Sequence, residues 1–208
     1  MKLKQGIGVA LASTVLLAGC TTDKGEMKAY NKQIQKAFDD EKSINTSSKK
    51  LNDLEQKKNK LVQSLKGKDE DKEKEIAKKV IDNTKERQQT FKEEENAMDK
   101  SHQDYKKASK HIDKIGNSKK QREVKQLDTA LKEKYKAHDK YADAYKNVMN
   151  KEKDMFEYAS KGQPSQGKLD KKSHAISGAY KDMNKQFKNY SNAMKKVKEE
   201  KQDVDNLM

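Results

Sequence analysis

The chain has 208 residues, of which 31% are hydrophobic and 39% are charged, and its formal net charge at pH 7 is +14. So few apolar residues combined with so high a charge are typical of disordered chains rather than of globular domains. Cys20 is the single cysteine, which excludes an intramolecular disulfide.

The first residues have the pattern of an export signal. A short basic stretch precedes an uncharged, mostly apolar run over residues 7–17, and this run is too short to span a bilayer stably. Small residues follow it, as a peptidase that must reach the backbone requires. We therefore predict that residues 1–19 are a signal peptide that is removed and takes no part in the fold.

The end of this segment resembles the lipobox of bacterial lipoproteins, which is here Leu17, Ala18, Gly19 and Cys20. The resemblance implies that Cys20 receives a diacylglycerol on its sulfur and becomes the new N-terminus. We expect residues 20–26 to form a lipidated tether that holds the protein on the outer face of the cell membrane.

Four series of apolar residues follow, each with steps of three or four positions, and no stretch alternates with a period of two. Such spacing places each series on one stripe of a helix, close to the heptad seam of a coiled coil. The pattern predicts four helices of roughly 40 residues, each on the order of 60 Å long. Their predicted ranges are 27–66, 69–115, 118–161 and 168–207.

Three interruptions separate these helices. The interruption at Gly67 is the weakest of the three, because one glycine costs a helix only about 1 kcal/mol. If the helix were continuous there, the first two helices would form one very long rod. Gly116 stands where a C-terminal cap is favoured, and Ser118 is the expected cap of the next helix. Residues 160–167 include the only proline and form the clearest loop. Such short connections predict one domain over residues 27–208, an all-α, elongated four-helix up-and-down bundle with antiparallel, coiled-coil-like helices.

Charged residues interrupt the predicted core seam at Lys58, Arg87, Glu94, Glu152 and Lys201. We expect the long basic side chains to cover apolar neighbours with their stems while their charged groups stay in water. The carboxylates of residues 93–95 are interpreted as a solvated helix face, because a narrow bundle offers little of the concavity that catalytic carboxylates need.

The sequence has no motif for catalysis or metal binding. The four histidines, His102, His111, His138 and His174, lack ligand spacing, and His138 lies on the apolar stripe like a packed histidine. There is no Gly-x-Ser-x-Gly elbow, no Cys-x-x-Cys pair and no glycine-rich phosphate loop. We predict a protein that is not an enzyme and needs no metal or cofactor.

Tyrosine is the one aromatic residue used heavily. A candidate interaction surface for a sugar or a peptide comprises Tyr135, Tyr141 and Tyr145 in the third predicted helix with Tyr180 and Tyr190 in the fourth. The alternative, which the pattern favours, is that these rings fill the bundle seam while their hydroxyls reach water.

Positive charge is in excess on the first, third and fourth predicted helices, and the chain without its signal peptide keeps a charge of +12. Export argues against nucleic acid as the partner. Teichoic acid, another anionic wall polymer or anionic lipid headgroups would be attracted, and salt would weaken that attraction. Two interpretations stay open: the basic surface binds such a polymer, or the charge only keeps a thin bundle soluble.

A lipobox followed at once by a Lys- and Glu-rich helical body resembles the YkyA-type lipoproteins of bacilli and staphylococci, for which cell-wall binding is the suggested role. The resemblance implies a four-helical bundle with a surface role in the cell envelope, and it supplies no catalytic residues. We therefore predict a non-enzymatic, membrane-anchored lipoprotein that binds an anionic cell-wall polymer. The alternative is an adaptor or regulator that binds an envelope protein through its helical faces.

Overall fold

The computed structural model describes residues 22–65, 67, 69–162 and 164–208, so the predicted signal peptide and Cys20 lie outside the described residues. Within these ranges the chain is helical and contains no strand. The α-helices are α1 (Thr22–Asp40), α2 (Ile44–Gln63), α3 (Glu70–Ser109), α4 (Ser118–Ala159) and α5 (Gln166–Asp205). Two short 3-10 helices, η1 (Glu41–Ser43) and η2 (Ile112–Lys114), follow α1 and α3.

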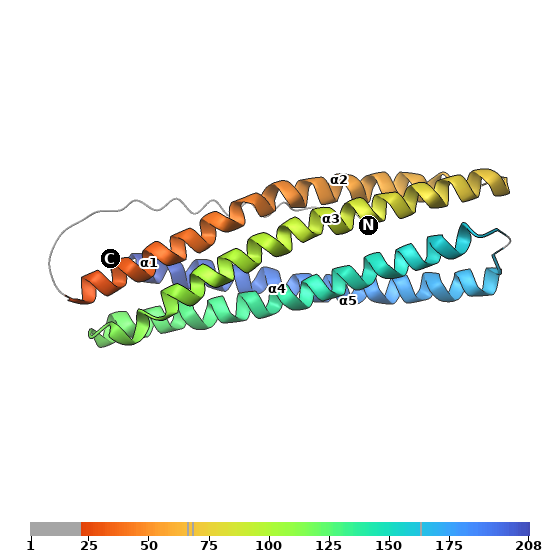
Figure 1. The fold of residues 1–208 in the computed structure, drawn as a ribbon. Coiled ribbons are helices and arrows are strands. Elements are labelled where there is room, and N and C mark those ends of the chain that lie inside the picture. The colour runs from red at the N-terminus through yellow and green to blue at the C-terminus, as the bar shows by residue number, and fades with distance from the viewer. Residues whose placement is uncertain (1–21, 66, 68, 163) are drawn as a thin grey trace.

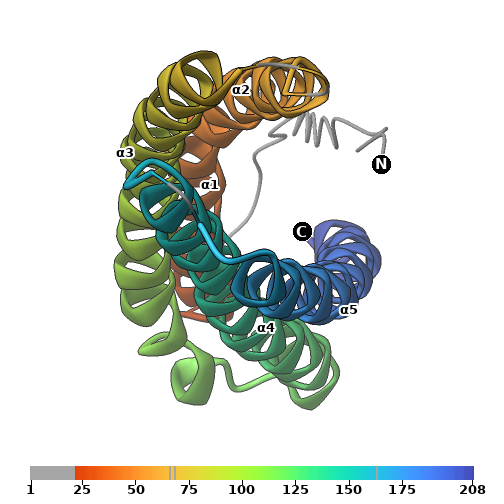
Figure 2. The same cartoon turned by 90° about the vertical axis from the view of Figure 1, so that its right-hand side faces the viewer.

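The helices form an elongated up-and-down bundle, which confirms the predicted fold class (Figure 1). Since η1 joins α1 to α2, these two helices make one long segment that runs antiparallel to α3. Helix α3 packs against α1, α2 and α4, whereas α5 packs along α4. Seen along the bundle, the helices form an arc with α2 and α5 at its two ends (Figure 2).

Helix α1 begins at Thr22 rather than at residue 27, so residues 22–26 belong to the bundle instead of a tether. Two polar contacts hold this extra turn. The Asp23 carboxylate accepts a hydrogen bond of 2.6 Å from the backbone N–H of Gly116, and the Glu26 carboxylate lies 2.6 Å from Nδ1 of His111.

The break near Gly67 is a full turn, because α2 and α3 lie side by side as antiparallel neighbours. Gly67 has φ of +70°, a conformation that glycine adopts without strain. The next connection differs from the prediction, since α3 ends at Ser109 and η2 follows. There Asn117, not Ser118, caps α4 by accepting a hydrogen bond of 3.1 Å from the N–H of Lys120.

All five charged residues of the predicted seam are buried, with at most 5% of their surface exposed. The expectation that the basic groups stay in water is wrong for Lys58 and Arg87, whose charged ends form ion pairs inside the bundle. Glu94 is buried while its neighbour Glu93 is exposed, so the interpretation of residues 93–95 as a solvated face is wrong at Glu94. Its place on the helical stripe turns it inward.

Candidate functional site

A groove of about 500 Å³ lies between α2 and α5, at the open side of the arc. Helix α5 carries two apolar stripes with a seven-residue spacing. The first stripe faces α4 and is buried; it consists of Met183, Tyr190, Val197 and Val204. The second stripe is only half-buried and consists of Tyr180, Phe187 and Met194. The second stripe faces the groove, because no helix packs closely along it in the described part of the chain.

The floor of the groove is aromatic. Tyr145, Tyr141 and Tyr190 form a row of nearly parallel rings, with centroids 6.1 Å apart at each step and interplanar angles of 5° and 7°. Phe91 packs edge-on behind Tyr145 and Tyr141. Burial, and then negative charges that include Glu94, raise the pKa of Tyr141 and Tyr190 well above the ordinary value of 10.0. Within the described ranges the hydroxyls of these two tyrosines have no hydrogen-bond partner.

Glu94 of α3 lines the groove together with these rings and has only 4% of its surface exposed. Its nearest basic partner is Nε2 of His138 on α4, at 3.5 Å. This nitrogen is itself buried without a hydrogen bond among the described residues. The His138 ring packs edge-on against Tyr190, with the centroids 5.2 Å apart. Among the described residues the carboxylate therefore has no hydrogen-bonded basic partner.

One end of the groove is closed by a buried ion network that joins α2, α3, α4 and α5. Arg87, which is fully buried, donates to Glu55 and, over 2.5 Å, to Glu152. Lys58 donates over 2.7 Å to both carboxylates and over 2.5 Å to the hydroxyl of Tyr180, which in turn donates to Glu152. Two cations thus balance two anions, as a dry interior requires. Burial acts to raise the pKa of Glu55, but Arg87 and Lys58 outweigh it and hold that pKa below its usual value.

Beyond the other end, a second polar cluster joins η1 to α3 and α4. The Glu41 carboxylate pairs with Lys134 and accepts a hydrogen bond from Ser101. The Ser101 hydroxyl lies 2.7 Å from that of Tyr135. A smaller recess of about 90 Å³, lined by Glu41 and Lys134, shares Tyr190 with the groove and extends it in this direction.

The structure brings together four of the five predicted tyrosines as groove-lining residues, Tyr141, Tyr145, Tyr180 and Tyr190, and places Tyr135 in the second cluster. All are buried except Tyr180, which is half-buried. The sequence reasoning missed Glu55. Residues 44, 48, 52 and 55 follow one another in steps of three or four, and this spacing in the sequence predicts that Glu55 lies on the same face of α2 as the other three, the face that lines the groove.

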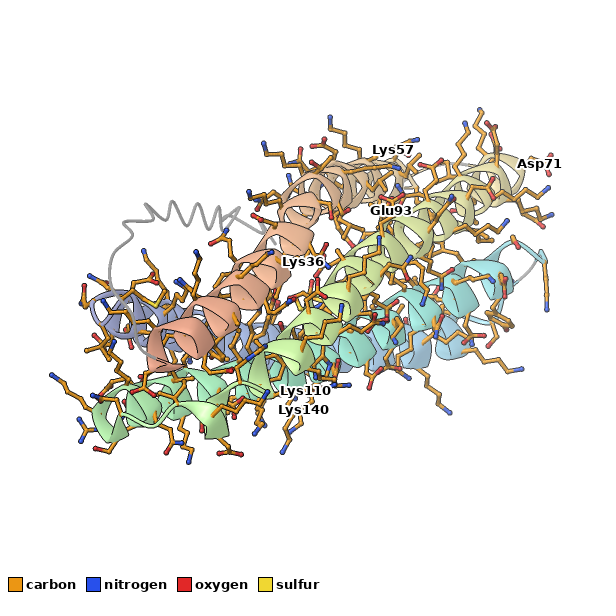
Figure 3. All side chains as sticks on the ribbon, turned by 60° about the vertical axis from the view of Figure 1, so that its left-hand side comes forward. Lys36, Lys57, Asp71, Glu93, Lys110 and Lys140 are labelled. Atoms are coloured by element: carbon orange, nitrogen blue, oxygen red, sulfur yellow. The ribbon has the colours of Figure 1, made fainter. Side chains whose placement is uncertain are left out.

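The outer face of α5 is basic. Lys181, Lys185, Lys188 and Lys195 are exposed, and their steps of four, three and seven residues place them on one stripe, named here the lysine stripe. The ion pairs of α5 among the described residues involve Lys172, Lys196 and Lys201 instead. Figure 3 shows how densely charged side chains cover the other helices as well, with Lys57 and Glu93 among the labelled examples.

The described ranges hold no group of three or more His, Cys, Asp or Glu side chains placed to bind a metal ion. Nor do they include a helix with the length and apolar character needed to cross a membrane.

The fold and the groove define an all-α bundle protein with a ligand-sized recess along its open side. The chain belongs to the YkyA family, whose sequence model matches residues 25–207 and describes a "putative cell-wall binding lipoprotein". This confirms the suspected family, and the description is that of a binding protein rather than an enzyme.

A crystal structure of a conserved protein of unknown function from Staphylococcus aureus is similar to this chain. The TM-score is 0.81 and the sequence identity 42%, over 90% of this chain and 97% of that one. A search of curated proteins gave no match.

Proposed function

We propose that this chain is a lipoprotein anchored to the outer face of the cell membrane through Cys20, and that it binds an anionic cell-wall polymer such as teichoic acid. The lipobox at residues 17–20 supports the anchor, and the family description supports the lipoprotein class and the cell wall as target. Only one residue separates Cys20 from the start of α1, so lipid on Cys20 would hold the bundle directly at the membrane surface.

The lysine stripe is the observation that carries polymer binding. Its residues Lys181, Lys188 and Lys195 are seven positions apart, which spaces them about 10 Å along the helix. Their charges face solvent, and the ion pairs that α5 makes in the described part of the chain involve other lysines. A regular row of free cations attracts a polymer with repeating phosphates, and this attraction weakens as salt screens it.

Polymer binding is tested by co-sedimentation of residues 21–208, which hold every described helix, with purified walls with and without teichoic acid over a salt series. One variant changes the four residues of the lysine stripe to Gln. Its control changes four lysines that already pair with acidic residues, Lys72, Lys79, Lys85 and Lys153. We expect binding that needs teichoic acid, fades as salt rises and falls more in the stripe variant. Equal losses in the two variants would contradict the role of the stripe.

The anchor has its own test. Cells that express the full chain are supplied with a labelled fatty acid, and Cys20→Ser is compared with the unchanged chain. We expect the variant to lose the label and to appear in the medium or the soluble fraction. A variant that keeps the label would show that lipid is attached elsewhere.

The alternative function, an adaptor for an envelope protein, is favoured by the apolar lining of the groove. Hydrophobic contacts survive salt, so sedimentation with walls that persists at high salt and is lost in Phe187→Ala would favour it. Phe187 suits this test because its ring is half-buried, whereas Tyr141 and Tyr145 are needed in the core.

A further inference from the structure

We propose that the groove is a binding site for an organic ammonium group, with Glu94 as the counter-ion and Tyr141 and Tyr190 as the aromatic, hydrogen-bonding partners. This site differs from the polymer-binding surface proposed above. It lies on the floor of the groove rather than on the exterior of the bundle, and it selects the opposite charge.

The first argument is the charge balance of the groove. Glu55 and Glu152 each contact both Arg87 and Lys58, so their charges are neutralised inside the protein. Glu94 is as buried as Glu152, but among the described residues it has only His138 within ion-pair distance, at 3.5 Å and without a hydrogen bond. A buried carboxylate costs free energy unless it is paired with a cation. A cationic ligand would therefore be stabilised most beside Glu94.

The second argument is the aromatic lining. Ring faces attract cations, and the attraction is stronger where water is excluded. Tyr141 and Tyr190 are both more than nine-tenths buried, and their hydroxyls have no partner in the described structure, which leaves both available to a polar ligand. Phe187 and Met183 supply apolar surface for the carbon chain that carries the ammonium group. The volume of about 500 Å³ lies in the ordinary range for small-molecule sites.

The third argument is the composition of the rim. Neutral amides line it on both sides, with Asn45 and Asn52 on α2 and Asn184 on α5, and Lys49 is the one lysine of the described lining that lies at the rim. An anionic ligand would be repelled by Glu94, and a neutral ligand would leave the charge of Glu94 unpaired. The positive exterior disfavours free cations at long range, but at physiological salt this repulsion is screened over about 8 Å.

The probes are 4-phenylbutylamine, which is charged at pH 7, and 4-phenylbutanol, which has the same carbon skeleton without the charge. Each is titrated into residues 21–208 by calorimetry at physiological ionic strength, and tyrosine ring signals in NMR spectra locate the bound probe. We expect the amine to bind about tenfold more tightly than the alcohol, since only the amine pairs with the buried carboxylate. Neither probe contains phosphate, so the outcome is independent of polymer binding.

Glu94→Gln keeps the shape of the side chain and removes its charge, and Glu93→Gln, one residue away on the exposed face, makes the same change of net charge. We expect Glu94→Gln to abolish the preference for the amine and Glu93→Gln to preserve it. The proposal is overturned if neither probe binds, if the alcohol binds the unchanged protein as well as the amine, or if both variants retain the preference. The comparison of the amine with the alcohol on the unchanged protein tests the proposal even if Glu94→Gln does not fold.

Discussion

Replacing Arg87 by methionine tests whether the buried ion network holds the bundle together. Methionine keeps most of the length and apolar volume of the side chain but removes its charge and donors. The Glu55 and Glu152 carboxylates then share one cation, Lys58. The hydrogen bonds from Arg87 to Asn83, at 3.1 Å, and to Thr84, at 3.0 Å, are lost as well.

The expected cost follows from the burial of the network. Arg87 is fully buried, and the Glu152 side chain is 5% exposed. Removing one partner of such a pair costs about 3–5 kcal/mol. Because Lys58 remains 2.7 Å from both carboxylates, we expect the lower end, about 3 kcal/mol. In a chain of this size each kcal/mol lowers the melting temperature by about 2–4 °C, so the midpoint should fall by about 6–12 °C.

Urea unfolding followed by circular dichroism measures this loss, with Lys85→Met as the control on the same helix. Lys85 forms an exposed ion pair with Asp82 at 2.9 Å, and such pairs contribute less than about 1 kcal/mol. Adding Glu152→Leu to Arg87→Met should recover part of the loss, because no excess negative charge then stays buried. An Arg87→Met cost no larger than that of Lys85→Met would refute the reasoning and show that the network is solvated.

Three further predictions follow from particular contacts. The pKa of Glu55 is held below its usual value, so the stability that this group contributes is present above about pH 4.5 and is lost as pH falls through the folded-state pKa. When the melting temperature is measured at falling pH, it should therefore fall less in Arg87→Met than in the unchanged protein. Gly67→Ala should cost about 1–2 kcal/mol because of its positive φ, whereas Gly178→Ala, inside α5 with open space around it, should stabilise by up to about 1 kcal/mol in the same thermal melts. Tyr180→Phe removes the link from Lys58 to α5, and amide hydrogen exchange along α5 should become faster while α3 is unchanged; equal exchange in both helices would contradict that link.

The periodicity of the sequence was sufficient to predict the helices and the fold class. It also placed five charged residues on the core seam, and all five are buried. It did not predict where their charges go, because Lys58 and Glu152 are 94 positions apart and meet only when α2 and α4 are in register. A stripe reports which side of a helix faces inward, but not whether a long side chain ends in water or in an ion pair.

The groove was only partly predictable for a related reason. Clustering identified Tyr141, Tyr145, Tyr180 and Tyr190, since they share stripes on two helices. A closed four-helix bundle would have buried these rings completely. The opening arises because α5 packs along α4 and not against α2, and this choice depends on the packing of whole helices rather than on any local sequence signal.

The ion network also joins the two walls of the groove. A direct bond from Lys58 to the Tyr180 hydroxyl joins α2 to α5 at 2.5 Å, so a polar contact sets the spacing of the two walls. Well-packed apolar residues often replace a buried ion pair with equal or greater stability. We therefore expect its role here to be geometric: the polar contact at one end fixes how far the half-buried stripe of α5 stands from α2. A fully apolar replacement of Lys58, Arg87, Glu55 and Glu152 should let the walls meet, so the protein would keep or gain stability while binding of the ammonium probe is lost.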